Sequence, residues 1–501
     1  MTKECRYGLI KEVNNQIKPF QSTLREEMKM NLTYGIKDKP KFGQLIVFAL
    51  QQLLAILAAT IAVPSIVGNG MSQSAALFGA GVGTIVYLLF TKFRSPVFLG
   101  SSFAFLGSMF AAFGGAVSAE AGYAGIIAGA VFAGLVYVII AIVVKVAGVK
   151  WIDKLMPAVV IGPTVAIIGL SLAGNAIGDL STGKVMTDVV SQEIVDGKIV
   201  DVTNQVSAAN PYICVLVGLI TLFVVMITSV YGKKMMKLIP FIIGIVAGYI
   251  VATIFTVVGI KTGDASLQII NFDAFKDMTI FAVPEFTFLK AYKGIKLVNY
   301  ATIAVAYVPV AFVVFAEHIA DHKNLSSIIG TDLLKEPGLH RTLLGDGVGS
   351  MAGAFFGGCP NTTYGESIGC VAITGNASVI TILATSIIAI VISFFGPFVT
   401  FLASIPNCVM GGVCIALYGF IAVSGLKMVQ KVDLGENNNL FVVAVILICG
   451  IGGFSLTFGK VTLTEIACAL ILGIITNLVL NGKKNAPVED DDDKTILIDE
   501  A

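Results

Sequence analysis

Charge is scarce in this chain of 501 residues, because only 13% of its side chains are charged. A soluble globular domain usually carries about 25% charged residues, so the composition argues against a soluble protein. The formal net charge of +1 offers little attraction for a nucleic-acid backbone, which excludes a nucleic-acid partner. The eight cysteines form no Cys-X-X-Cys pair, and most lie in apolar runs, where a thiol behaves as a small hydrophobic group.

The sequence is instead rich in apolar residues and glycine. Hydrophobic residues make up 56% of the chain, glycine occurs 53 times, and the mean hydropathy is +0.88. Apolar runs of about 20 residues are typical of membrane-spanning helices, which pack closely through small residues. The runs predict an all-α polytopic membrane protein with 14 spans, at 43–67, 71–91, 97–114, 122–147, 155–177, 212–231, 237–259, 299–319, 339–357, 360–373, 377–404, 408–426, 438–457 and 461–481.

The basic residues predict the orientation of these spans. The N-terminal segment is rich in Lys and Arg, and further basic residues lie in the short connections 92–94, 145–154, 233–237 and 323–341, which fall on the same side. The connection 260–298 is an exception, because its lysines at 290, 293 and 296 fall on the opposite side, and its length weakens the rule there. The loop 178–210 falls on the opposite side and is acidic. Because basic short loops stay in the cytoplasm, we expect a multi-pass protein of the cytoplasmic membrane with both termini in the cytoplasm.

Two of the predicted spans do not resemble ordinary transmembrane helices. The segment 96–107 is interrupted by Pro and Gly, and the segment 360–369 (Pro-Asn-Thr-Thr-Tyr-Gly-Glu-Ser-Ile-Gly) is short and polar. They are the third and tenth spans, which correspond to each other if the chain consists of two inverted seven-span repeats. Paired interrupted segments of this kind indicate a transporter's binding site near the middle of the bilayer. The alternative is a pair of re-entrant loops with a structural role alone.

Three carboxylates lie in or next to apolar surroundings and are candidates for function. Glu317 and Asp321 are four residues apart in the eighth span, and therefore on one face of a helix, while Glu366 lies in the tenth. Carboxylates that share one cavity cannot all ionise cheaply, so we expect the cluster to carry a proton. The alternative to a functional role is that each carboxylate pairs with Lys or Arg, but the neighbouring apolar runs contain neither. For Asp321 a second alternative is solvation, because it is near the predicted cytoplasmic end of the span.

The remaining polar residues of these spans suggest no enzyme and no metal centre. His318 and His322 have the i, i+4 spacing of some metal ligands, but the other ligands of a metal set are absent from the sequence nearby. We therefore expect hydrogen-bonded or interfacial histidines. Asp346 is expected to open the ninth span at its cytoplasmic end, where a carboxylate suits the helix dipole. No nucleophile–base set is apparent, so we expect no catalytic residues and no bound cofactor.

Several motifs of the chain resemble a known family. The stretches 315–319 (Phe-Ala-Glu-His-Ile), 332–341 and 360–366 (Pro-Asn-Thr-Thr-Tyr-Gly-Glu) resemble those of bacterial uracil permeases in the nucleobase–ascorbate transporter family. The stretches 50–60 and 99–105 match as well, and the similarity extends over most of 45–480. Purine-type members usually lack the carboxylate that Glu366 supplies.

This resemblance implies a division into a core domain (spans one to four and eight to eleven) and a gate domain (the other six spans). It also implies a short strand followed by a half-helix in the third and tenth segments, and a possible homodimer through the gate domain. On this division the segments are an N-terminal cytoplasmic segment 1–42, the core domain 43–150 and 299–404, the gate domain 151–298 and 405–482, and a cytoplasmic tail 483–501.

The resemblance further implies the residues that hold a nucleobase. Glu317 and Glu366 would bind its N–H and carbonyl edge, the backbone of Gly365 and Phe103 would hydrogen-bond it, and Tyr364 and Ala59 would line the pocket. Glu317, with Asp321 and His318, would couple transport to protons. Some uracil permeases have His where this chain has Asp321, so the proton path is expected to differ from theirs.

The function expected from the resemblance is proton-coupled uptake of uracil across the bilayer by alternating access. The co-transported H⁺ would take the place of a cofactor. Two alternatives remain: a symporter for xanthine or another purine base, and an anion transporter or channel of related fold.

Overall fold

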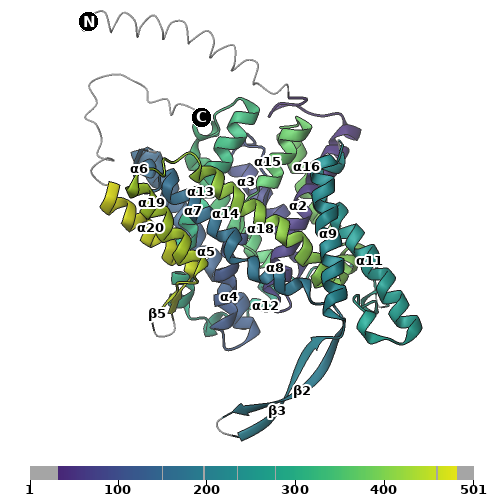
Figure 1. Cartoon of the computed structure of the whole chain (residues 1–501). Helices are drawn as coiled ribbons and strands as arrows, with labels where there is room; N and C mark the ends of the chain where they lie inside the picture. Colours follow the sequence, from purple (N-terminus) through teal and green to yellow (C-terminus); the bar gives the residue numbers. More distant parts are fainter. Residues whose placement is uncertain are drawn as a thin grey trace, which may run out of the picture.

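The computed structural model describes residues 32–148, 150–195, 198–233, 235–276, 278–458 and 461–481. Most of the expected N-terminal segment 1–42 and the whole tail 483–501 lie outside these residues. The described chain is a bundle of helices with three two-stranded sheets (Figure 1).

The helices occupy most of the chain. Their bounds are α2 Phe42–Val67, α3 Gln73–Phe90, α4 Leu106–Gly114, α5 Ala119–Ala147, α6 Lys150–Leu155, α7 Ala158–Ser171, α8 Ala173–Leu180, α9 Pro211–Tyr231, α10 Met235–Leu238, α11 Pro240–Thr262, α12 Thr287–Ala291, α13 Tyr300–Ile329, α14 Leu339–Gly357, α15 Gly365–Thr374, α16 Val379–Ile392, α17 Gly396–Ser404, α18 Asn407–Val429, α19 Asn437–Ile451 and α20 Glu465–Asn481. Short helical turns lie at η1 Phe103–Phe105, η2 Ala265–Leu267, η3 Asp273–Phe275, η4 Ile295–Leu297 and η5 Leu334–Gly338.

Eight segments among the described residues are long and apolar enough to cross a membrane, by length and composition. They are Phe42–Val67, Gln73–Phe90, Ala119–Ala147, Ala158–Leu180, Pro211–Tyr231, Pro240–Thr262, Tyr300–Ile329 and Asn407–Val429. Four shorter apolar helices accompany them, at Phe103–Gly114, Val379–Ile392, Asn437–Ile451 and Glu465–Asn481. The chain is thus a multi-pass membrane protein, and the count of 14 spans in two inverted repeats stays a prediction.

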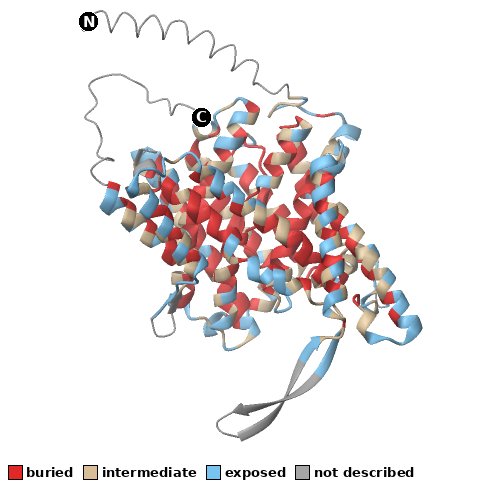
Figure 2. Cartoon of the chain, viewed as in Figure 1, coloured by how far each residue is buried: buried red, intermediate tan, exposed pale blue. Residues whose placement is uncertain are grey.

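Buried residues fill the middle of the bundle, while exposed ones gather at its ends and periphery (Figure 2). The peripheral helices present large apolar side chains outward; on α9, Phe223 and Ile227 are 53% and 56% exposed, and on α11 Ile254 is 59% exposed. In water such a surface would be a liability, whereas lipid acyl chains solvate it. Proline at the first position of α9 and of α11 suits the start of a helix, because the missing N–H has no partner there.

The helices pack as two groups. The first group contains α2–α5 and α13–α16, and the second contains α7–α9, α11 and α18–α20. The first group is held by close contact of α3 with α14: a Cβ at Gly79 would lie 2.6 Å from the carbonyl oxygen of Gly353. Only glycine permits this approach of two helix backbones. The two groups meet mainly along α2 and α13, which contact α11, α7 and α20 of the second group.

Two of the three sheets are hairpins. Strands β2 (Met186–Val195) and β3 (Lys198–Ser207) pair antiparallel and project beyond the helices at one end of the molecule (Figure 1). Strands β5 (Leu456–Phe458) and β6 (Val461–Leu463) form a smaller hairpin. The acidic loop expected at 178–210 is therefore largely a β-hairpin, which alternating Thr, Val and polar residues favour.

The third sheet joins distant parts of the chain. Strand β1 (Leu99–Ser101) pairs antiparallel with β4 (Asn361–Thr363), with Gly100 opposite Thr362. η1 and α4 follow β1, and α15 follows β4. The third and tenth segments thus each contain the expected short strand followed by a half-helix, and they lie side by side in the first group.

Candidate functional site

A cavity of ≈ 380 Å³ lies between the two groups of helices. One wall consists of α13, β4, α15 and η1, and the opposite wall of α7, α11 and α18. Among the described residues, three carboxylates and one lysine line it, namely Glu317, Asp321, Glu366 and Lys237. The volume falls within the range of small-molecule sites, about 300–1,000 Å³.

The half-helices turn their first residues toward this cavity. Phe103 begins η1, which leads into α4, and Gly365 begins α15, and both residues line the cavity. The first N–H groups of a helix have no partner within it, and the helix dipole makes this end partly positive. The cavity therefore combines backbone donors from two helix starts with carboxylate acceptors.

The β1–β4 pair fixes the positions of the two helix starts. The Ser102 N–H donates to the Pro360 carbonyl at 2.9 Å, which extends the pairing. Tyr364 donates from its hydroxyl to the Ser101 carbonyl at 2.8 Å, and its ring lies where a Cβ on Gly100 would be only 2.3 Å away. Only glycine fits opposite this ring, so the sequence Leu99-Gly100-Ser101 allows Tyr364 to close the wall of the cavity.

Helix α2 supports α15 from behind. The Gln52 Nε2 donates to the Ser367 Oγ at 2.5 Å, and that oxygen also accepts from the Phe98 N–H at 3.2 Å. Gln52 and Ser367 are 3% and 0% exposed. One buried hydroxyl therefore ties α2, α15 and the segment before β1 together.

The carboxylates come from two separate segments. Glu317 and Asp321 lie on one face of α13, and Glu366 lies in the first turn of α15. Thr363 in β4 donates from its hydroxyl to Asp321 Oδ2 at 2.6 Å. In the described part of the chain, none of the three carboxylates forms an ion pair, and all three line the same cavity. They are thus available to a ligand.

Most of the residues expected at the site line the cavity. Glu317, Glu366, Gly365, Phe103, Tyr364 and Asp321 all do so. Ala59 does not; Ala55, one turn earlier on α2, lines the cavity instead. His318 is fully buried on another face of α13 and also does not line it.

Lys237 is a cavity residue that the sequence analysis did not identify. It lies in α10, in the connection between α9 and α11, and its side chain is exposed. Ser229 near the end of α9 also lines the cavity, whereas the β2–β3 hairpin joins the start of that helix. The exposed lining residues include Lys237, Ile373 and Ser424, which lie toward the ends of α10, α15 and α18, and from these we infer an opening at the end of the molecule opposite the hairpin.

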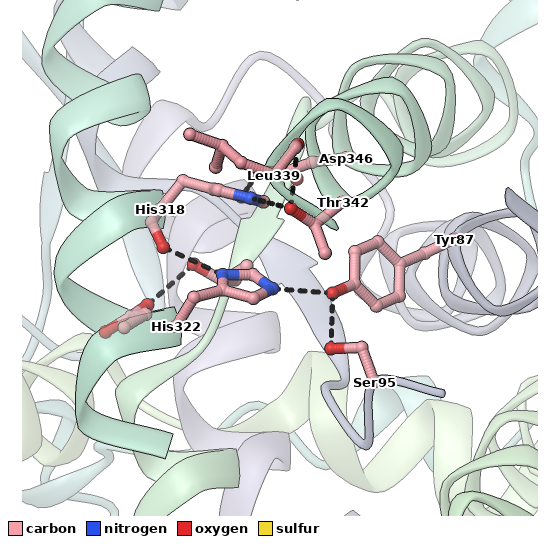
Figure 3. Close-up of polar contacts among 9 residues, drawn as sticks. Tyr87, Ser95, His318, His322, Leu339, Thr342 and Asp346 are labelled. Atoms are coloured by element: carbon pink, nitrogen blue, oxygen red, sulfur yellow. Dashed lines mark hydrogen bonds and ion pairs between the residues drawn. The ribbon is translucent and has the colours of Figure 1, made fainter. Parts of the chain in front are cut away.

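A second polar cluster lies beside the cavity, in the first group of helices (Figure 3). His318 Nδ1 lies 2.7 Å from Asp346 Oδ2, and His318 Nε2 lies 2.9 Å from Thr342 Oγ1. His322 stacks on His318 at 4.0 Å between ring centroids, and its Nε2 lies 2.7 Å from the Tyr87 hydroxyl. The expectation of hydrogen-bonded histidines is confirmed.

Asp346 corrects one expectation. It does not open a span in contact with solvent but lies inside α14, where it is 1% exposed. The buried His318 on α13 provides its partner, and 28 residues separate the two in the sequence. The sequence around Asp346 does not show which distant residue will pack against it, so the sequence analysis missed this pair. Among the described residues no group of His, Cys, Asp and Glu suited to a metal ion is found.

Comparison with known proteins identifies relatives over almost the whole chain. A family described as the permease family matches residues 43–458. The uracil permease of Bacillus caldolyticus is 38% identical over 454 residues, which are 90% of this chain and 95% of that protein. The uracil permease of Escherichia coli K12 is 32% identical over 447 residues, covering 89% of this chain and 93% of that protein.

Solved structures share the fold at low sequence identity. The transmembrane domain of the cyanobacterial bicarbonate transporter BicA superposes with a TM-score of 0.57 at 16% identity, covering 89% of this chain and 99% of that one. The murine anion transporter Slc26a9 in an inward-facing state gives 0.61 at 11% identity, covering 89% and 69%. At these identities the likeness describes the architecture and not the ligand.

Proposed function

This chain belongs to the permease family, whose members are transporters and not enzymes, and from this premise we propose that it carries uracil across the membrane with a co-transported proton. The observation that supports this most directly is the meeting of Glu317 and Glu366, from separate segments, at one cavity that also receives two helix starts. The names of the relatives in two Bacillus species and in Escherichia coli favour uracil as the cargo.

The chemistry of the cavity matches that of a uracil ring. Uracil presents two N–H donors and two carbonyl acceptors around a flat apolar body. Glu317 and Glu366 accept from N–H groups, and the N–H groups of Phe103 and Gly365 donate to carbonyls. Such a site rejects analogues that lack a matching group, because its own buried polar groups would then lose their partners. The rings of Phe103 and Tyr364 cover the apolar body.

A proton supplies the driving force that a neutral base lacks. Moving one charge through 100 mV provides about 2.3 kcal/mol, and each pH unit adds about 1.4 kcal/mol. Together these correspond to roughly several hundred-fold accumulation. We assign the proton to Glu317, with Asp321 beside it on the same helix face. We assign His318 no direct part in carrying the proton, because it does not line the cavity.

Alternating access follows from the two helix groups. In this proposal the first group is the core domain, which holds the base, and the second is the gate domain, which shifts past it. The opening lies opposite the β2–β3 hairpin, so the orientation expected from the basic loops makes this an inward-facing conformation. A shift of the groups along α2 and α13 would close this opening and expose the other end.

The rival cargoes differ in what they require of the site. Xanthine carries the same N–H and carbonyl groups on its six-membered ring as uracil, so the names of the relatives, and not the chemistry of Glu366, favour uracil over it. An anion, as carried by the structural relatives, would meet three carboxylates and a single exposed lysine at the rim. The starts of η1 and α15 would attract an anion, but ionised carboxylates in the same partly desolvated cavity would repel it, which disfavours this cargo. The carboxylates thus favour a neutral base over an anion, and the names of the relatives favour uracil among the bases.

Uptake into proteoliposomes tests the proposal. We expect an acid-outside gradient to drive accumulation of labelled uracil, with competition by excess uracil and not by xanthine. Glu317→Gln should abolish gradient-driven accumulation but retain exchange of uracil for uracil, while Glu120→Gln, at an exposed position on α5, should behave as wild type. Gradient-independent uptake by the wild type, or full accumulation by Glu317→Gln, would reject the assignment of the proton.

A further inference from the structure

A small second cavity lies behind the base site. Its volume is ≈ 10 Å³, and its lining includes Tyr137 of α5, Asp346 of α14 and Asn361 of β4. Thr362 lines both this cavity and the larger one, so strand β4 separates the two. A volume of about 10–15 Å³ is the least that admits one water molecule.

Three residues that line this cavity each carry a buried polar atom with no hydrogen-bond partner among the described residues. These atoms are Asp346 Oδ1, the Tyr137 hydroxyl and Asn361 Oδ1, on side chains that are 1%, 4% and 1% exposed. Asn361 already uses its Nδ2 to donate to the Gly79 carbonyl at 3.0 Å, so its amide oxygen is left as an acceptor. Buried polar atoms without a partner are costly and rare, and three around one small cavity indicate a bound species.

The charge at this site follows from counting hydrogen-bond donors. Thr342 donates its one hydroxyl proton to the Leu339 carbonyl at 3.0 Å, so it accepts from His318 Nε2–H. The 2.7 Å contact of His318 Nδ1 with Asp346 Oδ2 requires one further proton between them. The histidine and the carboxylate together are then neutral, wherever that proton lies along the contact.

Neutrality decides which species fits. A sodium ion would add an uncompensated positive charge to a buried neutral pair, which is strongly unfavourable. A water molecule adds none, and it supplies two donors and an acceptor. Its two donors match Asp346 Oδ1 and Asn361 Oδ1, and its acceptor matches the Tyr137 hydroxyl, so the hydrogen-bonding capacity of one water suits these three atoms.

We propose that the small cavity binds one water molecule, which joins α5, α14 and β4 and thereby positions the base site. Asn361 begins β4, and two residues later Thr363 donates to Asp321 Oδ2 at 2.6 Å. Holding Asn361 therefore holds the strand that orients a cavity carboxylate and leads into Tyr364. Asp346, Tyr137 and Asn361 act as positioning residues and do not touch the base.

Crystal structures identify the occupant directly. We expect one solvent peak within hydrogen-bond distance of all three atoms, present both in a sodium salt and after replacement of sodium by thallium(I) acetate. Thallium(I) scatters anomalously and occupies sodium and potassium sites, and we expect no anomalous signal in this cavity. No peak, or an anomalous peak, would overturn the assignment of water.

A matched pair of variants tests the positioning role. Tyr137→Phe removes one hydroxyl from the cavity, whereas Tyr307→Phe removes an equally buried, unpartnered hydroxyl that does not line it. We expect uracil affinity to fall about three- to tenfold for Tyr137→Phe and to stay within about twofold for Tyr307→Phe. Equal effects of the two would refute the role.

A rescue separates positioning from general packing. Val314 lines the same cavity, and Val314→Thr adds a hydroxyl with little change of shape. We expect Val314→Thr to restore uracil affinity in the Tyr137→Phe background, and failure of this rescue would assign the loss to packing and overturn the proposal. This affinity readout rests on the proposed function. If the wild type binds no uracil, that function fails, while the crystallographic test still decides the occupant.

Discussion

Gly100 offers the sharpest test of how the site is built. Replacing it by alanine places a Cβ 2.3 Å from Cε2 and 2.4 Å from Cζ of Tyr364. Rotation of the Tyr364 ring alone cannot remove this clash, because the residue is only 4% exposed and its hydroxyl donates a hydrogen bond to the Ser101 carbonyl. Gly100 cannot yield either, since its strand is paired with β4. Tyr364 must therefore leave its place in the cavity wall.

The expected magnitude follows from overpacking. Forcing one extra methyl group into a packed site costs about 1–3 kcal/mol. Binding requires Tyr364 to return to the wall, so this cost appears as about 5- to 150-fold weaker uracil binding. Gly107→Ala is the matched control, because on α4 the nearest atom to the added Cβ is 3.8 Å away.

The assay is equilibrium binding of labelled uracil to purified protein in detergent, with a thermal melt of each variant. We expect Gly107→Ala to bind as wild type, and both variants to elute as folded protein. Wild-type affinity of Gly100→Ala would show that Tyr364 does not form the wall, and the geometry described for the β1–β4 pair would be wrong. An equal loss in both variants would refute the reasoning in the same way.

Three further predictions concern contacts around the site. Ser367→Ala removes the hydroxyl shared by Gln52 and Phe98 and should lower the free energy of unfolding by about 1–3 kcal/mol, seen as a lower melting temperature than that of the exposed control Ser424→Ala. Lys237→Gln should change uracil affinity by less than about fivefold in a titration, because this exposed lysine forms no ion pair with the described carboxylates; a larger loss would indicate such a pair in solution. The exposed Arg94–Glu336 ion pair should contribute less than about 1 kcal/mol, so Glu336→Gln should leave the melting temperature nearly unchanged and a clear drop would contradict this.

Local sequence signals predicted the two interrupted segments well. Pro96 and Gly100 in one, and Pro360 and Gly365 in the other, disfavour a continuous helix. The short strand in each segment was implied by the family resemblance and not by these local signals. The pairing of the two strands is a long-range contact. The inverted-repeat argument related the two segments to each other, but it did not provide the register of the strands. The spacing of Glu317 and Asp321 correctly placed both on one helix face.

Other features depend on tertiary structure that the sequence pattern does not encode. The resemblance implied Ala59, whereas Ala55 lines the cavity; residues four apart share a helix face, so helical phase alone does not distinguish the two. His318 follows Glu317 directly and therefore points about 100° away from it, toward α14. The hairpin at 186–207 was hidden by its acidic composition, which suggested a loop.

The β1–β4 pair also has a consequence for how the protein is made. The strands are separated by more than 250 residues, and each finds its sheet hydrogen bonds only on the other. At about 5–20 residues per second, the ribosome delivers β4 roughly 13–50 s after β1. During that interval the polar edge of β1 must be shielded from lipid by water, by neighbouring helices or by the insertion machinery. Co-expressed halves of the chain, split within the 260–298 connection, should therefore protect each other from proteolysis.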